Sequence, residues 1–167
     1  MKGTLSPSEF RTLKGIEYFD FEEDFIEENV RCIPMIVRFK LDATGIKLKL
    51  NEWSKFSAAD RITLALMPAE KPIEVNRYFN FLTALIEDVT KGKATPLAID
   101  NKPAWGNLEE VPQILAELFE VYNLDINTQK WSKLTDLQRF ALLKLCRPGH
   151  ENKNFPKALL EFGLICN

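Results

Sequence analysis

Hydrophobic positions recur along this chain at helical spacing, and two stretches carry the same pattern. Residues 33–66 can be laid on residues 111–144 without a gap, at a shift of 78 residues. The identical pairs in this register are Pro34 and Pro112, Ile36 and Ile114, Trp53-Ser54-Lys55 and Trp131-Ser132-Lys133, Arg61 and Arg139, and Leu64 and Leu142. The remaining aligned positions mostly keep their physical role. The pattern therefore predicts two tandem helical repeats, at about 33–90 and 111–162.

The first helix of each predicted repeat begins at a proline. Proline suits the first turn of a helix, where its missing N–H is not needed. Pro34 and Pro112 hold these positions. Gly45 would end the first helix in the left-handed conformation, and Asn123, the next-best residue for that conformation, holds the equivalent place in the second repeat.

An apolar link and a short tryptophan-bearing helix come next in each predicted repeat. The links are residues 46–48 and 124–126, and their alternating pattern would let them lie side by side, as a small two-stranded contact or as plain packing. Trp53 and Trp131 follow, and each is expected on a short helix.

A capped helix then carries an arginine. Ser57 and Thr135 stand three residues before Asp60 and Gln138, the spacing of a capping box. The matched residues Arg61 and Arg139 lie one position further on. We interpret both arginines as structural, with the stem lying over the tryptophan or the guanidinium bonded to a carbonyl of the link.

Further helices are expected at about 73–90 and 155–162. Residues 92–108 have two prolines, one glycine and no periodicity, and they are expected to be the linker between the repeats. The predicted fold is a single all-α domain with an internal two-fold repeat.

Composition limits the classes of function. Hydrophobic residues make up 46% of the chain, charged residues 28%, and the net charge is -2. This balance disfavours nucleic acid and anionic membranes as partners. An odd count of 3 cysteines without C-x-x-C spacing, no apolar signal segment and no run of about 18 apolar residues predict a cytoplasmic protein.

Residues 17–28 are strongly acidic, with phenylalanines interleaved. One interpretation is a docking surface for a partner protein. The other is a solvated helix face with Phe21 and Phe25 in the core and an acidic residue near a helix N-terminus. The candidate partner surface consists of Asp20, Glu22, Glu23, Asp24 and Glu27.

A polar turn follows the second capped helix, and it contains the only histidine. Its candidate functional residues are Arg147, His150, Glu151, Asn152 and Asn154. Cys146 and His150 are four residues apart, which could serve a nucleophile pair, but two ligands do not make a structural zinc site. The loop at Asp42–Trp53 lacks the ligand spacing of a calcium site. We expect no cofactor, no metal site and no catalytic residue. The turn is interpreted as a hydrogen-bonded loop that supports the last helix, and the alternative is that its side chains serve catalysis or bind a ligand.

Two motifs resemble a known family. They are F-E-x-D-F (21–25) running into R-C-I-P-M (31–35), and Q-R-F-A-L (138–142) running into R-P-G-H-E-N (147–152). Both are similar to the nitrate-reductase-associated proteins of bacteria, over about Phe19 to Leu164. The resemblance implies a link with nitrate reductase and molybdopterin synthesis, whose genes lie near those of the family. It implies no reaction and carries over no catalytic residue.

The leading hypothesis is a non-catalytic accessory protein of nitrate assimilation that assists assembly or cofactor loading of nitrate reductase. Its partner would be nitrate reductase or a protein of the molybdopterin pathway. One alternative is a small ligand-binding protein or enzyme acting at the Arg147–Asn154 turn. The other is a structural homodimer module built on the repeat.

Overall fold

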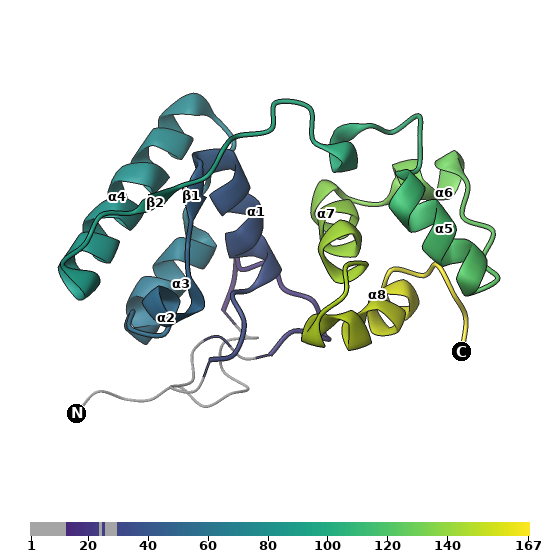
Figure 1. Cartoon of the computed structure of the whole chain (residues 1–167), viewed down its shortest axis with the longest axis horizontal. Coiled ribbons are helices and arrows are strands. Elements are labelled where there is room, and N and C mark those ends of the chain that lie inside the picture. Colours follow the sequence, from purple (N-terminus) through teal and green to yellow (C-terminus); the bar gives the residue numbers. More distant parts are fainter. Residues whose placement is uncertain (1–12, 24, 26–29) are drawn as a thin grey trace. The chain divides into compact units, whose positions relative to one another are not determined.

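The fold was established from a computed structural model, which describes residues 13–23, 25 and 30–167, the last range without the side chains of residues 150 and 151 (Figure 1). The described part holds eight α-helices and one small two-stranded sheet, which confirms the all-α prediction. The chain forms two compact units. Unit 1 comprises residues 1–18 and 22–100, and unit 2 comprises residues 19–21 and 101–167.

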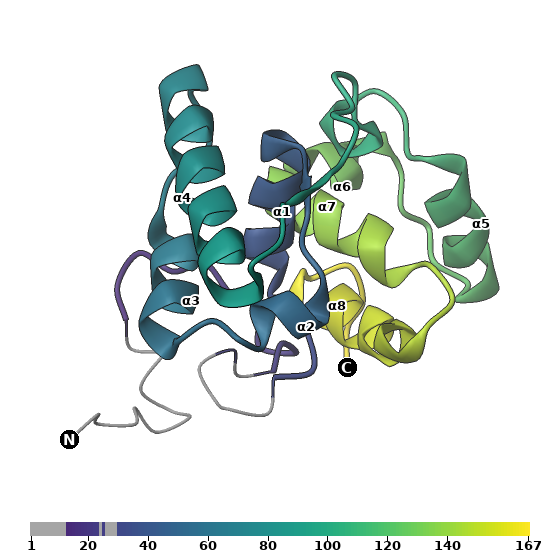
Figure 2. The same cartoon turned by 60° about the vertical axis from the view of Figure 1, so that its left-hand side comes forward.

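Unit 1 is built from four helices and the sheet. The elements are α1 (Met35–Thr44), β1 (Ile46–Lys47), α2 (Leu50–Trp53), α3 (Ala58–Leu66), α4 (Pro72–Thr90) and β2 (Thr95–Pro96). Helix α4 runs alongside α1, and α1 also contacts α3 (Figure 2). Tyr78, Leu82 and Ile86 are buried along one side of α4 at a spacing of four residues. That spacing keeps them on one helix face, which packs into the core of the unit.

The helix boundaries of unit 1 follow the predicted signals closely. Pro34 caps α1 in extended backbone, and Gly45 ends it with a φ of 74° while its N–H donates to the carbonyl of Leu41. Ser57 caps α3 by accepting a hydrogen bond from the Asp60 N–H. Helix α4 ends at Lys91, a residue other than glycine in the left-handed conformation, with a φ of 59°.

The two-stranded contact forms between other partners than predicted. Strand β1 pairs antiparallel with β2, with Ile46 opposite Pro96. Residues 124–126 belong to no strand, so the two-stranded form of the predicted contact between the links is wrong. The physical reason lies in the segment after α4, which returns along β1: the Leu97 N–H donates to the Gly45 carbonyl at 2.8 Å. The predicted linker, residues 92–108, therefore contains a short strand.

Unit 2 is built around α7. Its elements are η2 (Ala104–Gly106), α5 (Gln113–Val121), α6 (Thr128–Lys133), α7 (Asp136–Leu145), η3 (His150–Asn154) and α8 (Phe155–Glu161). Helix α7 contacts η2, η3 and α8 and buries six of its residues. Helix α5 joins this core through Phe119, whose ring stacks with Phe155 at a centroid distance of 6.2 Å.

The acidic stretch is not a helix over the residues that the structure describes between 17 and 23, so the predicted solvated helix face is wrong there. Its aromatic residues are used in packing. Phe19 stacks on Phe21 at 5.3 Å and meets Phe162 at 4.9 Å, both distances between ring centroids. The sequence of alternating acids and aromatics therefore reflects a chain that packs its rings in extended and turned backbone.

Candidate functional site

Each unit contains a buried arginine stacked on a buried tryptophan. The guanidinium carbon of Arg61 lies 5.9 Å from the ring centroid of Trp53, and that of Arg139 lies 5.8 Å from the ring centroid of Trp131. All four residues are almost fully shielded from solvent. Each arginine therefore lies over its tryptophan, as the first of the two predicted interpretations has it.

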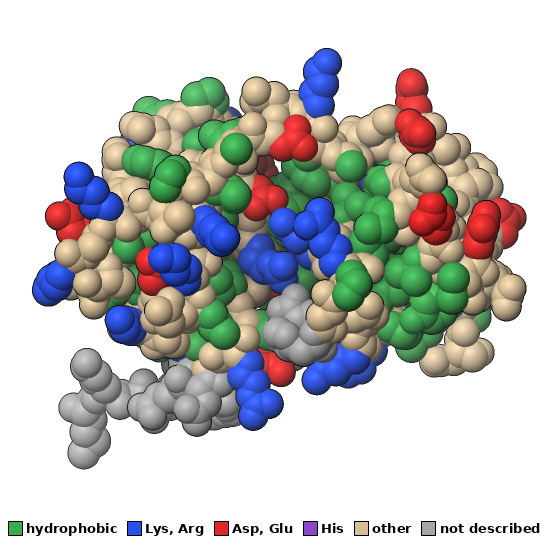
Figure 3. Space-filling view, viewed as in Figure 1, with side chains coloured by type: hydrophobic (Ala, Val, Ile, Leu, Met, Phe, Trp, Pro, Cys, Tyr) green, Lys and Arg blue, Asp and Glu red, His purple; other side chains and the backbone are tan. Residues whose placement is uncertain are grey.

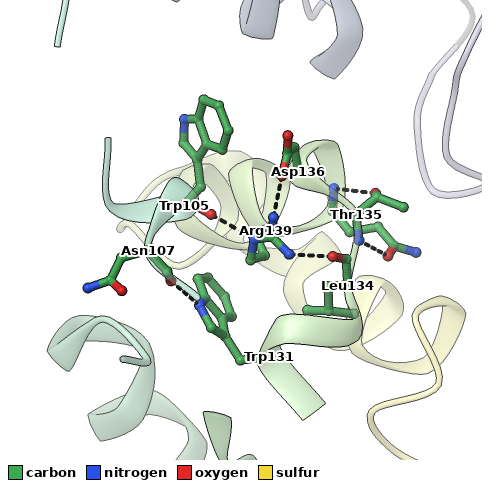
Figure 4. A network of polar contacts seen from close by, with 8 residues as sticks. Trp105, Asn107, Trp131, Leu134, Thr135, Asp136 and Arg139 are labelled. Atoms are coloured by element: carbon green, nitrogen blue, oxygen red, sulfur yellow. Dashed lines mark hydrogen bonds and ion pairs between the residues drawn. The ribbon is translucent and has the colours of Figure 1, made fainter. Parts of the chain in front are cut away.

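The guanidinium of Arg139 is held by three acceptors from its own unit (Figure 4). Its Nε donates to the Trp105 carbonyl at 2.6 Å, and its two terminal nitrogens donate to the Leu134 carbonyl and the Asp136 carboxylate. An arginine that is bonded in this way fixes η2 and the start of α7 together. Its hydrogen-bonding capacity serves the fold, so it offers little to a bound ligand.

Arg61 is held in the same manner in unit 1. Its nitrogens donate to the carbonyls of Trp53, Phe25 and Ser54 at 3.0–3.2 Å. Burial lowers the pKa of Arg61, and the nearby Asp60 carboxylate opposes that effect. The three carbonyls compensate for the lost hydration of the guanidinium.

The two tryptophans differ at the indole N–H. Trp131 Nε1 donates to the Asn107 carbonyl at 2.8 Å. Trp53 Nε1 is buried and has no acceptor within the described ranges 13–23, 25 and 30–167. The two units therefore share the arginine–tryptophan contact but not the hydrogen bond that anchors the ring.

Lys40 is a buried charged group that the sequence analysis did not single out. Its Nζ donates to the Ala65 carbonyl at 2.6 Å. Burial lowers the pKa of Lys40 to about 8, with Glu17 and Glu70 opposing the shift. The available signal was its spacing: Lys40 stands four residues from Ile36 and three from Val37, which places it on the inward face of α1.

The Arg147–Asn154 turn forms η3, which leads directly into α8. The Asn152 N–H donates to the Gly149 carbonyl at 3.2 Å, and Asn152 Nδ2 lies 3.5 Å from the Arg147 carbonyl. Arg147 is exposed and Asn154 half-buried, whereas the side chains of His150 and Glu151 lie outside the described part. A role for this turn in function stays a prediction.

Cys146 precedes the turn and is unsuited to nucleophilic chemistry. It is buried, and its Sγ lies 3.2 Å from the Leu143 carbonyl. Burial raises the pKa of the Cys146 thiol, which disfavours the reactive thiolate. The part of the chain that the structure describes contains no group of three or more histidine, cysteine, aspartate or glutamate side chains that could bind a metal ion.

The predicted acidic partner surface is only partly described. Glu22 Oε1 accepts a hydrogen bond from the Met35 N–H at 2.6 Å, so this carboxylate caps α1. The Asp20 N–H donates to Glu161 at 2.8 Å, and Glu23 is exposed. Asp24 and Glu27 lie outside the described residues. At least one member of the set thus has a structural task.

Helix α5 has a hydrophobic stripe on its exposed side. Ile114, Leu118 and Val121 stand at positions i, i+4 and i+7, with Ile114 47% and Val121 75% exposed and Leu118 half-buried. We call these three residues the α5 face. Leu115 and Phe119, on the neighbouring side, supply the buried contacts of the helix. The sequence signal was present, because the stretch I-L-A-E-L-F-E-V-Y has more apolar positions than one core-facing side can bury.

Acidic residues lie on α5 and flank it in the sequence. The stretch between Lys102 and Lys130 contains no lysine or arginine and has five acidic residues, namely Glu109, Glu110, Glu117, Glu120 and Asp125. In the space-filling view, hydrophobic side chains gather over the α5 and α8 region, with acidic side chains toward α5 and basic ones below α8 (Figure 3). A contiguous exposed apolar surface with a polar rim is typical of an interaction site.

Comparison with protein families identifies the chain. The model of the conserved nitrate reductase-associated protein family matches residues 18–162. The chain belongs to this family. The match covers the two arginine–tryptophan contacts, the α5 face and the Arg147–Asn154 turn. It confirms the resemblance seen in the two sequence motifs.

Other comparisons add no further relative. No match was found among curated proteins, and none among solved structures. Within the described residues, no helix combines the length and the apolar character needed to cross a membrane. The description of the family names an association with nitrate reductase.

Proposed function

We propose that this protein is a non-catalytic accessory protein of nitrate assimilation that works in the cytoplasm by binding another protein. The partner is nitrate reductase, or a protein that assembles it or loads its molybdopterin cofactor. The observation that carries the proposal is the α5 face, a hydrophobic stripe that the unit's own packing leaves exposed. The family description supplies the link with nitrate reductase.

The buried polar groups support a binding role over a catalytic one. Arg61, Arg139 and Lys40 each donate to carbonyls of their own unit. Convergent polar groups around a cavity mark most active sites, and these three side chains are committed to holding helices and loops. The apolar α5 face has the opposite character, since it is exposed and makes no polar contact of its own.

The proposal is tested by affinity capture from the native cell. The tagged full chain is compared with a double variant, Ile114→Ser and Val121→Ser, and with the control Ile73→Ser, whose side chain on α4 is 59% exposed. We expect nitrate reductase or a molybdopterin-pathway protein to be enriched by the parent and by the control. Enrichment of neither class, or of no protein above an untagged background, would contradict the proposed function.

A further inference from the structure

We propose that the α5 face binds a basic amphipathic helix of the partner protein. This inference rests on the proposed function in one respect, namely that the protein acts by binding another protein. It adds the place of contact, the secondary structure of the partner segment and the sign of its charge.

The geometry of the α5 face fits a helix laid alongside it. Ile114, Leu118 and Val121 lie on one stripe that extends over seven residues, or roughly 10 Å at the α-helical rise. A facing helix presents apolar residues at the same i, i+4, i+7 spacing, so the side chains of two such helices can interdigitate. Recognition of this kind is common between proteins that bind a helical segment.

The stripe is not required by the packing of unit 2. Helix α5 is held by Leu115 and Phe119, which are almost fully buried, and by Tyr122, whose ring lies 5.8 Å from that of Phe155. A polar residue at position 114 or 121 would satisfy the unit equally well. Val121 at 75% exposure on a regular helix therefore has no structural explanation within its own unit.

The acidic residues on and beside α5 favour a basic partner over the other partners that could bind the α5 face. Glu117 and Glu120 lie on α5 itself, and Glu109, Glu110 and Asp125 flank the helix in the sequence. Two copies joined through this face would bring these carboxylates together, which is unfavourable. Nucleic acid and anionic membranes are repelled for the same reason. A helix with lysine or arginine beside its apolar stripe meets complementary charge.

A synthetic helix provides a direct probe. A 20-residue amphipathic peptide of leucine and lysine is titrated against the full chain by fluorescence anisotropy, with a peptide that has glutamate in place of lysine as the matched control. We expect the lysine peptide to bind at least ten times more tightly, and more weakly as salt is raised. The Ile114→Ser and Val121→Ser double variant should lose binding at least tenfold with an unchanged melting temperature, whereas Ile73→Ser should not.

Equal binding of the two peptides, or full binding by the double variant, would overturn the inference. Reversal of charge gives an independent measurement. The double variant Glu117→Lys and Glu120→Lys should bind the lysine peptide more weakly and the glutamate peptide more tightly than the parent does. If both affinities stay unchanged, Glu117 and Glu120 take no part in binding, and the proposed basic charge of the partner helix is wrong.

Photo-crosslinking in the native cell separates this inference from the proposed function. A photoreactive amino acid is placed at position 121, or at position 73 as the control, and the crosslinked peptide is sequenced. A basic helical segment crosslinked to position 121 supports the inference. If the protein that contains this segment has no part in nitrate assimilation, the proposed function is wrong and the inference still holds. Nitrate reductase captured from position 73 only, a second copy captured from position 121, or no product from position 121 would overturn the inference.

Discussion

Trp131 is fixed on two sides by polar contacts: Arg139 lies over its ring, 5.8 Å from the centroid, and the Asn107 carbonyl accepts its N–H at 2.8 Å. The carbonyls that bind Arg139 and Trp131, those of Trp105 and Asn107, come from the segment expected to be a linker. Residues 104–107 of that segment therefore belong to unit 2, and the arginine and the tryptophan together attach them to α6 and α7.

The first prediction compares the two tryptophans. Trp131→Ala should cost about 3–5 kcal/mol of unfolding free energy, because it empties a fully buried site. Replacement of a tryptophan by phenylalanine keeps an aromatic ring but removes the indole N–H, so it isolates the contribution of the hydrogen bond. Trp131→Phe should cost about 0.5–1.5 kcal/mol more than Trp53→Phe, since Trp131 loses its bond to Asn107 whereas the Trp53 N–H has no acceptor among the described residues. Urea unfolding of the three variants and the parent measures these costs, and equal costs for the two phenylalanine variants would show that the Asn107 contact contributes nothing.

The second prediction concerns Arg139. Arg139→Met should destabilise by about 3–5 kcal/mol, because buried carbonyls of Trp105 and Leu134 lose their donor and the Asp136 carboxylate loses its partner. Arg139→Lys should recover only part of this loss, since an ammonium cannot reproduce the planar arrangement of donors. Chemical denaturation is the measurement. A lysine variant as stable as the parent would mean that charge, not the donor geometry, is what the site needs.

The third prediction concerns helix ends. Gly45→Ala should cost at least about 1–2 kcal/mol, because a side chain there is strained at a φ of 74° and would lie 3.1 Å from the Leu97 carbonyl. Lys91 supplies the matched comparison, since it has a φ of 59° at the end of α4 and is exposed. Lys91→Gly should stabilise by about 0.5–1 kcal/mol. Thermal unfolding of both variants measures these changes in stability. A stabilised Gly45→Ala or a destabilised Lys91→Gly would show that the left-handed conformation does not determine stability at these helix ends.

The fourth prediction is a pH dependence due to Lys40. Because its pKa falls from 10.5 to about 8 on folding, the unfolded chain holds a proton between these values that the folded chain has released. The unfolding free energy should therefore rise with pH across this window, by at most about 1.4 kcal/mol per pH unit. Below about pH 8 both states are protonated and the full cost of burying the charge is present.

Lys40→Met is the control for that experiment. Burial raises the pKa of Cys146 and Tyr78, which lowers stability at high pH, but this effect is common to the parent and the variant. The difference between their urea midpoints, taken from pH 7.5 to 9.5, isolates the lysine. We expect the difference to shift in favour of the parent as the pH rises. Parallel curves would indicate that Lys40 is hydrated in the folded state.

Local signals in the sequence were sufficient for most helices. Proline before α1 and α5, left-handed Gly45 and Asn123, and hydroxyl caps at Ser57 and Thr135 all act within a few residues, and each is found as predicted. The strand pairing failed because it depends on which distant segment meets β1, and short apolar links do not encode a partner. That the two repeats superpose stays a prediction.

The candidate site was harder to predict than the fold. The contacts of Arg61 and Arg139 with their tryptophans were predicted, because the shared register tied each arginine to its tryptophan. The α5 face was missed because burial on a helix depends on what covers each side, and apolar periodicity alone does not report a side that remains uncovered. Lys40 was missed because a lysine is normally assigned to the solvent side. The partner roles of the acidic segment and of the polar turn stay predictions.

The membership of residues 19–21 in unit 2 has a consequence for dissecting the molecule. The Phe19 and Phe21 rings pack on Phe162, and the Asp20 N–H bonds to Glu161, yet all of unit 1 from residue 22 to residue 100 lies between these partners in the chain. A fragment that starts at residue 101 lacks three residues of its own unit, and a fragment that ends at residue 100 exposes two phenylalanines. A single cleavage of the chain therefore cannot release both units intact. During synthesis on the ribosome, residues 19–21 emerge before most of unit 1, and they can contact Glu161 and Phe162 only after α8 has been synthesised.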